Sequence, residues 1–225
     1  MAIVHESVAT TTGNASSIDA TLPAGIVAGD VMVAQYVFRA SSPLDTPTGW
    51  VEVASADSGA LQSPTVKVSY RVVDGTETST CLFRKTTTGA GNAQSAVGIM
   101  RFSGVNATVS DATVTAGSGN NASAIAPTTS TATASAMVIV LYGLNSATAT
   151  ITACTGVTES FETTANARSE GDYIIQDAAG NTGAKQADLS AAVRWVAFQW
   201  ALKPAAGAAG GTPPPGVLQP MGIVW

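Results

Sequence analysis

Charged residues are scarce in this chain of 225 residues: only 11% of positions are Asp, Glu, Lys or Arg, against roughly 25% in an average globular protein. The net charge is −5, and the only adjacent basic pair is Arg84-Lys85. A surface that binds nucleic acid needs clustered Lys and Arg to displace phosphate counterions. The sequence therefore argues against nucleic acid as a partner, and equally against a polybasic membrane anchor.

Histidine and cysteine are almost absent too, with one histidine, His5, and two cysteines, Cys81 and Cys154. A His-dependent triad would have to be built around His5, and no Gly-x-Ser-x-Gly motif accompanies it. Neither cysteine has a metal-ligand partner nearby in sequence. We therefore predict no catalytic residue, no cofactor and no metal site, and a protein that is not an enzyme. The cysteines are predicted to be free, packed thiols, with a disulfide as the open alternative.

Acidic side chains are the remaining candidates for catalytic or metal-binding residues. Glu52 and Glu159 stand at equivalent places in the two halves of the chain, each just past a Thr-Gly pair. Glu159 with Glu162, and Glu170 with Asp172, could act as calcium ligands, but no spaced Asp/Asn loop supports a calcium site. The prediction is that these are solvated carboxylates on strands and loops.

Targeting signals are missing as well. The first six residues, MAIVHE, lack a basic start and an apolar run, so no signal peptide is predicted. The longest apolar runs, such as residues 31–38, are far too short to span a bilayer. The chain is expected to be made in the cytoplasm and to have no membrane partner.

The chain is rich in Thr, Ser, Ala, Gly and Val, which suit pleated strands and tight turns. Helix-favouring Glu, Lys, Arg and Leu are few. Hydrophobic residues make up 45% of the chain, enough for a sizeable core. This composition predicts an all-β protein.

The sequence resembles itself across its two halves. Four blocks recur in the same order, with an offset that falls from about 105 residues to 96. The pairs are 29–34 (GDVMVA) with 135–140 (SAMVIV), 48–52 (TGWVE) with 155–159 (TGVTE), 69–74 (SYRVVD) with 172–177 (DYIIQD), and 96–102 (AVGIMRF) with 192–198 (AVRWVAF). A period this long is not that of a solenoid or a propeller. It predicts an internal repeat.

We predict one jelly-roll-like sandwich of about nine strands over residues 1–203, with repeat halves at about 1–105 and 106–203. A single sandwich buries the apolar faces of both halves more completely than two tandem sandwiches would. Two tandem domains remain the alternative.

Strand alternation predicts which side chains of residues 194–202 face the core. The inward set is Val196, Phe198, Trp200 and Leu202. Met100 and Phe102 take the same positions in the first half, and Ile99 falls on the outer face. Trp50 is expected in the core. Trp195 falls on the outer face, so it is predicted to be an exposed contact residue whose removal costs little stability.

The composition changes abruptly after Lys203. Residues 204–216 form a Gly/Ala/Pro linker that could reach roughly 40 Å at about 3.1 Å per residue. Residues 217–225 (VLQPMGIVW) are apolar and carry no side-chain charge. We predict that this C-terminal arm docks on a neighbouring subunit or scaffold; folding back on its own domain is the alternative. The predicted contact residues are Val217, Leu218, Met221, Ile223, Val224 and Trp225.

Four motifs carry a resemblance to a known family. They are residues 22–30 (LPAGIVAGD), 47–50 (PTGW), 69–72 (SYRV) and 200–204 (WALKP). Over about residues 1–204 the chain resembles a duplicated β-sandwich family of bacteriophage virion accessory proteins. It departs from the pattern at Val157, where the second half lacks the tryptophan. The family has no agreed catalytic residues, so none are carried over.

The resemblance implies a structural virion protein, of the capsid-decoration or minor-tail type, made in the host cytoplasm and located in the virion. Its partners would be capsid or tail subunits, and it could form a homo-oligomer. The alternative is a lectin-like module that binds a glycan on the host surface. Such a module would need exposed aromatic side chains beside polar groups in one concavity.

Overall fold

The computed structural model describes residues 1–59, 63–86, 94–164 and 167–206, and within these ranges it contains strands and no helix. The arm residues 217–225 and most of the linker lie outside the described residues. The strands are β1 (Val4–Asn14), β2 (Ser17–Thr21), β3 (Val31–Phe38), β4 (Val51–Asp57), β5 (Thr65–Val72), β6 (Thr80–Arg84), β7 (Gln94–Ser103), β8 (Val105–Ser110), β9 (Thr115–Ala126), β10 (Ser130–Thr131), β11 (Ala136–Leu144), β12 (Ile151–Thr152), β13 (Thr158–Glu162), β14 (Arg168–Gln176), β15 (Gly180–Asn181) and β16 (Lys185–Pro204).

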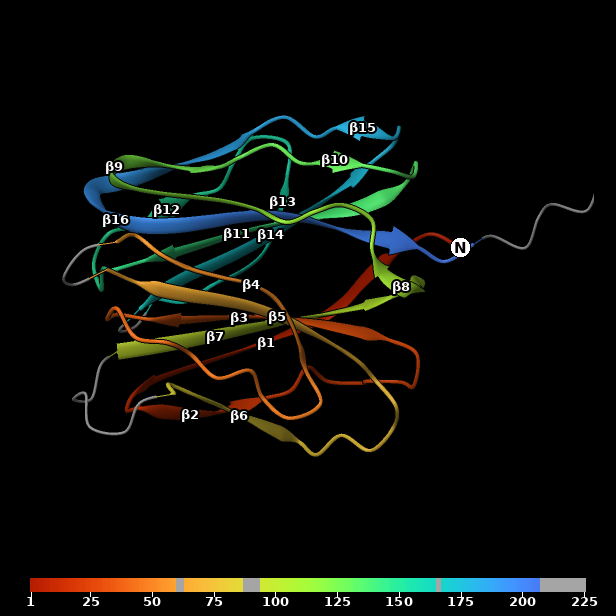
Figure 1. The fold of residues 1–225 in the computed structure, drawn as a ribbon, viewed down its shortest axis with the longest axis horizontal. Coiled ribbons are helices and arrows are strands. Elements are labelled where there is room, and N and C mark those ends of the chain that lie inside the picture. The colour runs from red at the N-terminus through yellow and green to blue at the C-terminus, as the bar shows by residue number, and fades with distance from the viewer. Residues whose placement is uncertain (60–62, 87–93, 165–166, 207–225) are drawn as a thin grey trace, which may run out of the picture.

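Two large antiparallel sheets dominate the fold (Figure 1). The first has the order β1-β7-β3-β5-β4. The second has the order β12-β16-β11-β14-β13, with β8 and β9 also paired to β16. Two small sheets, β2-β6 and β10-β15, complete the set. The protein is thus all-β and built from antiparallel sheets, and each large sheet comes from one half of the chain.

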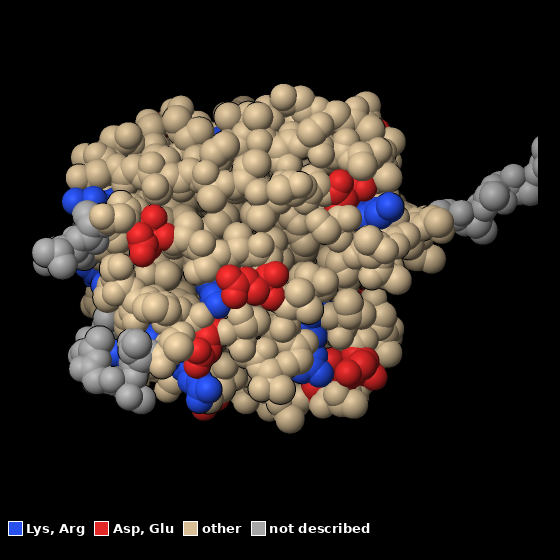
Figure 2. Space-filling view, viewed as in Figure 1, with Lys and Arg blue, Asp and Glu red and all other residues tan. Residues whose placement is uncertain are grey.

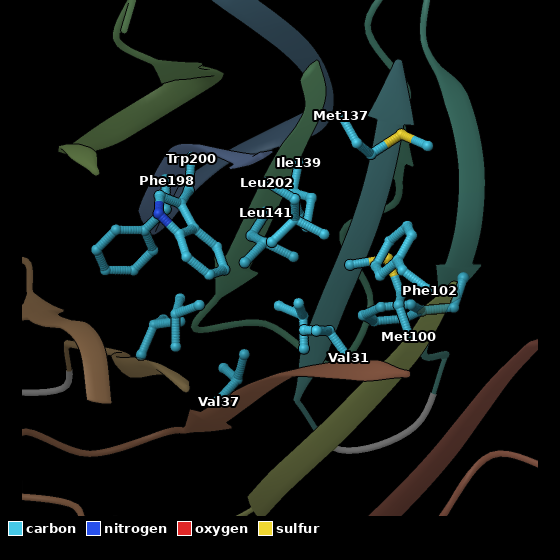
Figure 3. Packing of buried hydrophobic residues seen from close by; sticks show 14 of the residues in the cluster. Val31, Val37, Met100, Phe102, Met137, Ile139, Leu141, Phe198, Trp200 and Leu202 are labelled. Carbon is cyan, nitrogen blue, oxygen red and sulfur yellow. The ribbon is translucent and has the colours of Figure 1, made fainter. Parts of the chain in front are cut away.

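The central core lies between the two large sheets. In Figure 3, Val31 and Val37 of β3 face Ile139 and Leu141 of β11 across the gap between the sheets. On β16 the buried side chains in this core are Val196, Phe198, Trp200 and Leu202. The inward positions predicted by strand alternation are therefore confirmed for β16, as they are for Met100 and Phe102 of β7.

The outer faces of both sheets are also buried, as the wholly buried strands β3 and β11 show. Ile99 was assigned to an outward position, but it is fully buried in a second core that includes Ile18 and Phe83 of the β2-β6 sheet. Trp50 belongs to this outer core, as predicted. The described residues also form sixteen strands, two-residue strands included, where about nine were predicted. The difference arises because polar, small-residue segments form strands that cover the large sheets.

The outer face of the second sheet is covered by the paired strands β9 and β16. Their register shifts between Asp188 and Val193, and Figure 1 shows the ribbon bending at one end of the molecule. Beyond the bend, Ala124, Ala187 and Leu189 pack with Val140 of β11 in a third core. A stretch rich in Gly, Ser and Asn thus becomes a structural layer rather than a connection.

The position of the central core leads to a testable prediction. The inner face of each large sheet is covered only by the other large sheet. Residues 1–105 alone would therefore expose the inner face that carries Val31 and Val37 to water. We expect the full chain to unfold in one cooperative transition in urea, and the isolated 1–105 fragment to give the poorly dispersed amide spectrum of an unfolded chain. A dispersed spectrum from the fragment would favour two independent domains.

Charged side chains are few on the face shown in Figure 2, and acidic and basic groups lie next to one another there rather than forming a patch of one sign. Among the described residues, Arg84 and Asp45 form an ion pair at 2.6 Å, and Arg71 and Glu77 form one at 2.9 Å. The face shown in Figure 2 therefore offers no patch of one charge sign to which a charged polymer would bind.

Candidate functional sites

The predicted contact residue Trp195 is buried, with 4% of its surface exposed, so that prediction is wrong. Its indole Nε1 donates a hydrogen bond to Asn121 Oδ1 at 3.1 Å. Its ring packs so closely on Gly119 that a Cβ there would lie 2.6 Å from Cζ2. Strand alternation placed Trp195 on the outer face correctly, but the parts of β9 and β16 beyond the bend cover that face.

A cavity of about 550 Å³ opens on the outer side of the first sheet, where Trp50, Arg71 and Arg84 contribute to its walls. Threonine hydroxyls provide much of the remaining polar lining, from Thr46, Thr48, Thr78 and Thr80. The corresponding positions of the second half carry Val157 and Ile174 in place of Trp50 and Arg71. The second half therefore does not repeat these two lining residues.

The charges in the cavity are largely satisfied from within. Arg84 Nε pairs with Asp45 Oδ2 at 2.6 Å, and Arg71 Nε pairs with Glu77 Oε1 at 2.9 Å. Trp50 is only 7% exposed and packs edge-on against Phe83, so it offers little flat surface to a ligand. The cavity can take a small, uncharged polar molecule through its threonine hydroxyls, but it is a poor platform for stacking a sugar ring.

The sole histidine joins the two sheets. Its Nε2 lies 2.9 Å from Ser160 Oγ of β13, and its ring stacks on Tyr173 of β14 with centroids 4.6 Å apart. Burial lowers the pKa of His5. Among the described residues no carboxylate is hydrogen-bonded to its other ring nitrogen, so the pair lacks the orienting acid of a catalytic triad. We interpret this contact as a link between the sheet edges.

The acidic residues of β13 and β14 are not simply solvated, and here the sequence prediction is wrong for two of them. Glu170 and Asp172 are fully buried. They share one face of β14, because the intervening Gly171 faces Phe161 in the central core. Across the β13 ladder, Glu162 lies opposite Glu170 and Glu159 opposite Asp172. Four acidic residues are thus brought to one edge of the second sheet.

The two buried carboxyl groups have no hydrogen-bond donor among the described residues. Burial, followed by the negative charges of neighbouring carboxylates, raises the pKa of both Glu170 and Asp172. The one guanidinium nearby along the strand, Arg168, uses its Nη1 to donate to Glu162 Oε1 at 3.0 Å. Sequence alternation could place the two acids on one face, but it carried no signal of their burial.

The corresponding position in the first sheet has the opposite charge. Tyr36 of β3 lies opposite Lys67 of β5, as Tyr142 of β11 lies opposite Glu170 of β14. Lys67 is also buried, and its Nζ donates to Glu52 Oε2 at 2.7 Å. This hydrogen bond lowers the pKa of Glu52. One sheet thus has an ion pair where the other has buried acids.

The described residues also limit the possible metal sites, thiol pairing and membrane spans. No group of three or more His, Cys, Asp or Glu side chains in the described ranges is arranged to hold a metal ion. Cys81 and Cys154 are both free and partly buried, and burial raises the pKa of the Cys81 thiol. Within the part of the chain that the structure describes, no helix is long and apolar enough to cross a membrane.

Comparison with known proteins returns no relative. No family model matches the chain, and neither the curated proteins nor the solved structures include a significant match.

Proposed function

We propose that this protein is a structural accessory protein of a bacteriophage virion, of the capsid-decoration or minor-tail type. In this proposal it attaches to other virion subunits partly through the arm at residues 217–225. The proposal is supported by the motif resemblance given above and by the way in which the described chain leads into the linker. It assigns the protein a binding role and no catalysis.

The observation that carries the proposal is the fixed exit point of the chain. After β16, the Ala205 N–H donates to Gly104 O at 2.8 Å. The N-terminal ammonium of Met1 donates to Ala205 O at 3.0 Å. Figure 1 shows the N-terminus beside the end of β16 at one end of the molecule. A segment that starts from such a point can direct an apolar arm toward one neighbour while the sandwich stays in place.

We further propose that the two halves are an internal repeat, with the jelly-roll-like character predicted from the sequence. Two observations support the repeat. The first sheet runs β1-β7-β3-β5-β4, and the corresponding strands of the second run β9-β16-β11-β14-β13. Both edge strands also shift register at the matching place, after Glu52 in β4 and after Glu159 in β13. A repeat would give a virion protein two similar surfaces on one chain.

The glycan-binding alternative has one structural feature in its favour, the cavity beside Trp50. Trp50, Trp195 and Trp200 are each less than a tenth exposed, which leaves these three rings little surface for stacking. We therefore place the structural role first.

Removal of the arm tests the proposal. Deleting residues 207–225 should leave a folded protein, because every strand of the structure ends at or before Pro204. Full-length and truncated chains would be mixed with virions assembled without the protein and separated on a density gradient. We expect the full chain to sediment with the particles and the truncated chain to remain at the top.

A matched control separates the arm from the linker. A variant in which residues 205–211 are replaced by a Gly/Ser segment of equal length should still sediment with the particles. If the truncated chain binds as well as the full chain, the arm is not the anchor. If the full chain fails to bind, the virion role itself is rejected.

A further inference from the structure

We propose that Glu170 and Asp172 form a proton-holding pair, and that loss of their protons at alkaline pH loosens the β13-β14 edge of the second sheet. The inference does not depend on the virion proposal. It rests on the geometry of two neighbouring acids on the same face of β14, both with no exposed surface.

Burial without a donor makes the ionised state of this pair costly. None of the four carboxyl oxygens accepts a hydrogen bond from a described residue. An isolated ionised carboxylate in a protein interior is strongly unfavourable, and two adjacent ones also repel each other. A proton on one acid supplies an O–H donor that the other acid can accept. One bound proton therefore joins the two groups by a hydrogen bond, and a second proton removes the remaining negative charge.

The groups that face the pair from β13 and β14 do not neutralise it. Glu159 and Glu162 of β13 are acidic and raise the pKa of Glu170 further. Arg168 is the one cation on the same face of β14, and its Nη1 is bonded to Glu162 at 3.0 Å. The charges on these two strands thus favour retention of the proton.

Two further groups lie near the pair, Tyr142 and Cys154. Tyr142 of β11 lies opposite Glu170, and its hydroxyl donates to Lys185 O at 3.1 Å. Cys154, from the segment after β12, is close enough to affect the pKa of Tyr142, and its Sγ lies 3.5 Å from Thr155 O, which accepts its hydrogen bond. Neither group donates to the acids. A bound proton is therefore the neutralising partner that fits, since no third metal ligand completes the site among the described residues.

In the first sheet, the equivalent buried position is neutralised by an ion pair. Lys67 occupies the position that corresponds to Glu170, and its Nζ lies 2.7 Å from Glu52 Oε2. The second sheet has a carboxyl group there, so its cohesion depends on retained protons, whereas the first sheet has an ion pair at the same place. The proposed proton-holding pair is thus confined to the second half of the molecule.

The direction of the pH effect follows from the raised pKa values of both acids. The folded protein keeps these protons at pH values where the unfolded chain has lost them. The stabilising contribution is therefore complete below the ordinary carboxyl pKa of about 4. It is lost as the pH rises through the folded-state values.

The test uses the full chain and its Glu170→Gln and Asp172→Asn variants. Urea midpoints would be measured from about pH 5 to about pH 10. We expect the midpoint of the unmodified protein to fall over this range, and the fall to shrink by at least half in each variant. Asp188→Asn, which removes an exposed carboxyl group on β16, is the control and should keep the full dependence.

Direct titration covers the case in which a variant does not fold. In the unmodified protein, the side-chain carboxyl carbon of Glu170, followed by NMR, should titrate well above the range of exposed glutamates. Titration in the ordinary range would overturn the proposal, as would equal pH dependence in Glu170→Gln and the unmodified chain. Recovery of stability at high pH on adding calcium would also overturn it, because a metal ion would then be the partner.

Discussion

Replacing Trp195 by alanine is expected to destabilise the protein by about 3–5 kcal/mol, the usual cost of truncating a large core aromatic. The indole is 4% exposed in the outer core of the second sheet. The truncation would leave a cavity beneath β9 and would also remove the hydrogen bond to Asn121. Urea denaturation of the purified variant measures the loss.

Two companion variants define the result. Trp200→Ala should cost a similar amount, because Trp200 lies in the central core and its Nε1 donates to Ser110 Oγ at 3.0 Å. Trp195→Phe keeps most of the packing and should cost clearly less than Trp195→Ala. A Trp195→Ala protein within about 0.5 kcal/mol of the unmodified chain, as expected of a surface change, would show that β9 does not cover this face in solution.

Gly98→Ala is expected to cost about 3 kcal/mol, at the upper end for overpacking a well-packed core. Gly98 lies on β7, and a Cβ at this position would overlap the ring of Phe161 from β13. The ring also lies so close to Gly171 that a Cβ there would overlap it. It therefore has little freedom to move away from a new methyl group at position 98. Thermal or urea unfolding gives the change in stability.

A double-mutant cycle assigns this cost to the Phe161 ring. Phe161→Ala alone should destabilise the protein by leaving a cavity between the sheets. In the Phe161→Ala background, however, Gly98→Ala should cost little, since the obstructing ring is gone. An unchanged cost in that background would place the strain elsewhere, in the backbone of β7.

The sequence predicted the chain's inner architecture better than its outer layers. Alternation on β16 identified Phe198 and Trp200 as core residues, because a period of two is all that a single buried face requires. It failed for Trp195 and Ile99 because both faces of each sheet are buried. The strands that cover the outer faces are rich in small polar residues. Their sequences therefore lack the apolar alternation from which a covering strand could be predicted.

The candidate sites depended on contacts that no local pattern encodes. His5 and Ser160 are 155 residues apart and meet only because the sheet edges come together. The burial of Glu170 was likewise hidden. The one available signal was the internal repeat, since aligning the halves sets Glu170 against Lys67 and reveals a reversal of charge.

The register shifts in β4 and β13 have a consequence for how copies of this protein meet. Each of these strands ends its sheet and pairs with one neighbour only. A free strand edge is a template for pairing with another chain, and a bulge together with a charged side chain disfavours that pairing. Both edges carry such a bulge beside a glutamate, Glu52 or Glu159. These two edges are therefore protected against pairing with another copy of the protein, and concentrated solutions should not form fibrils through them.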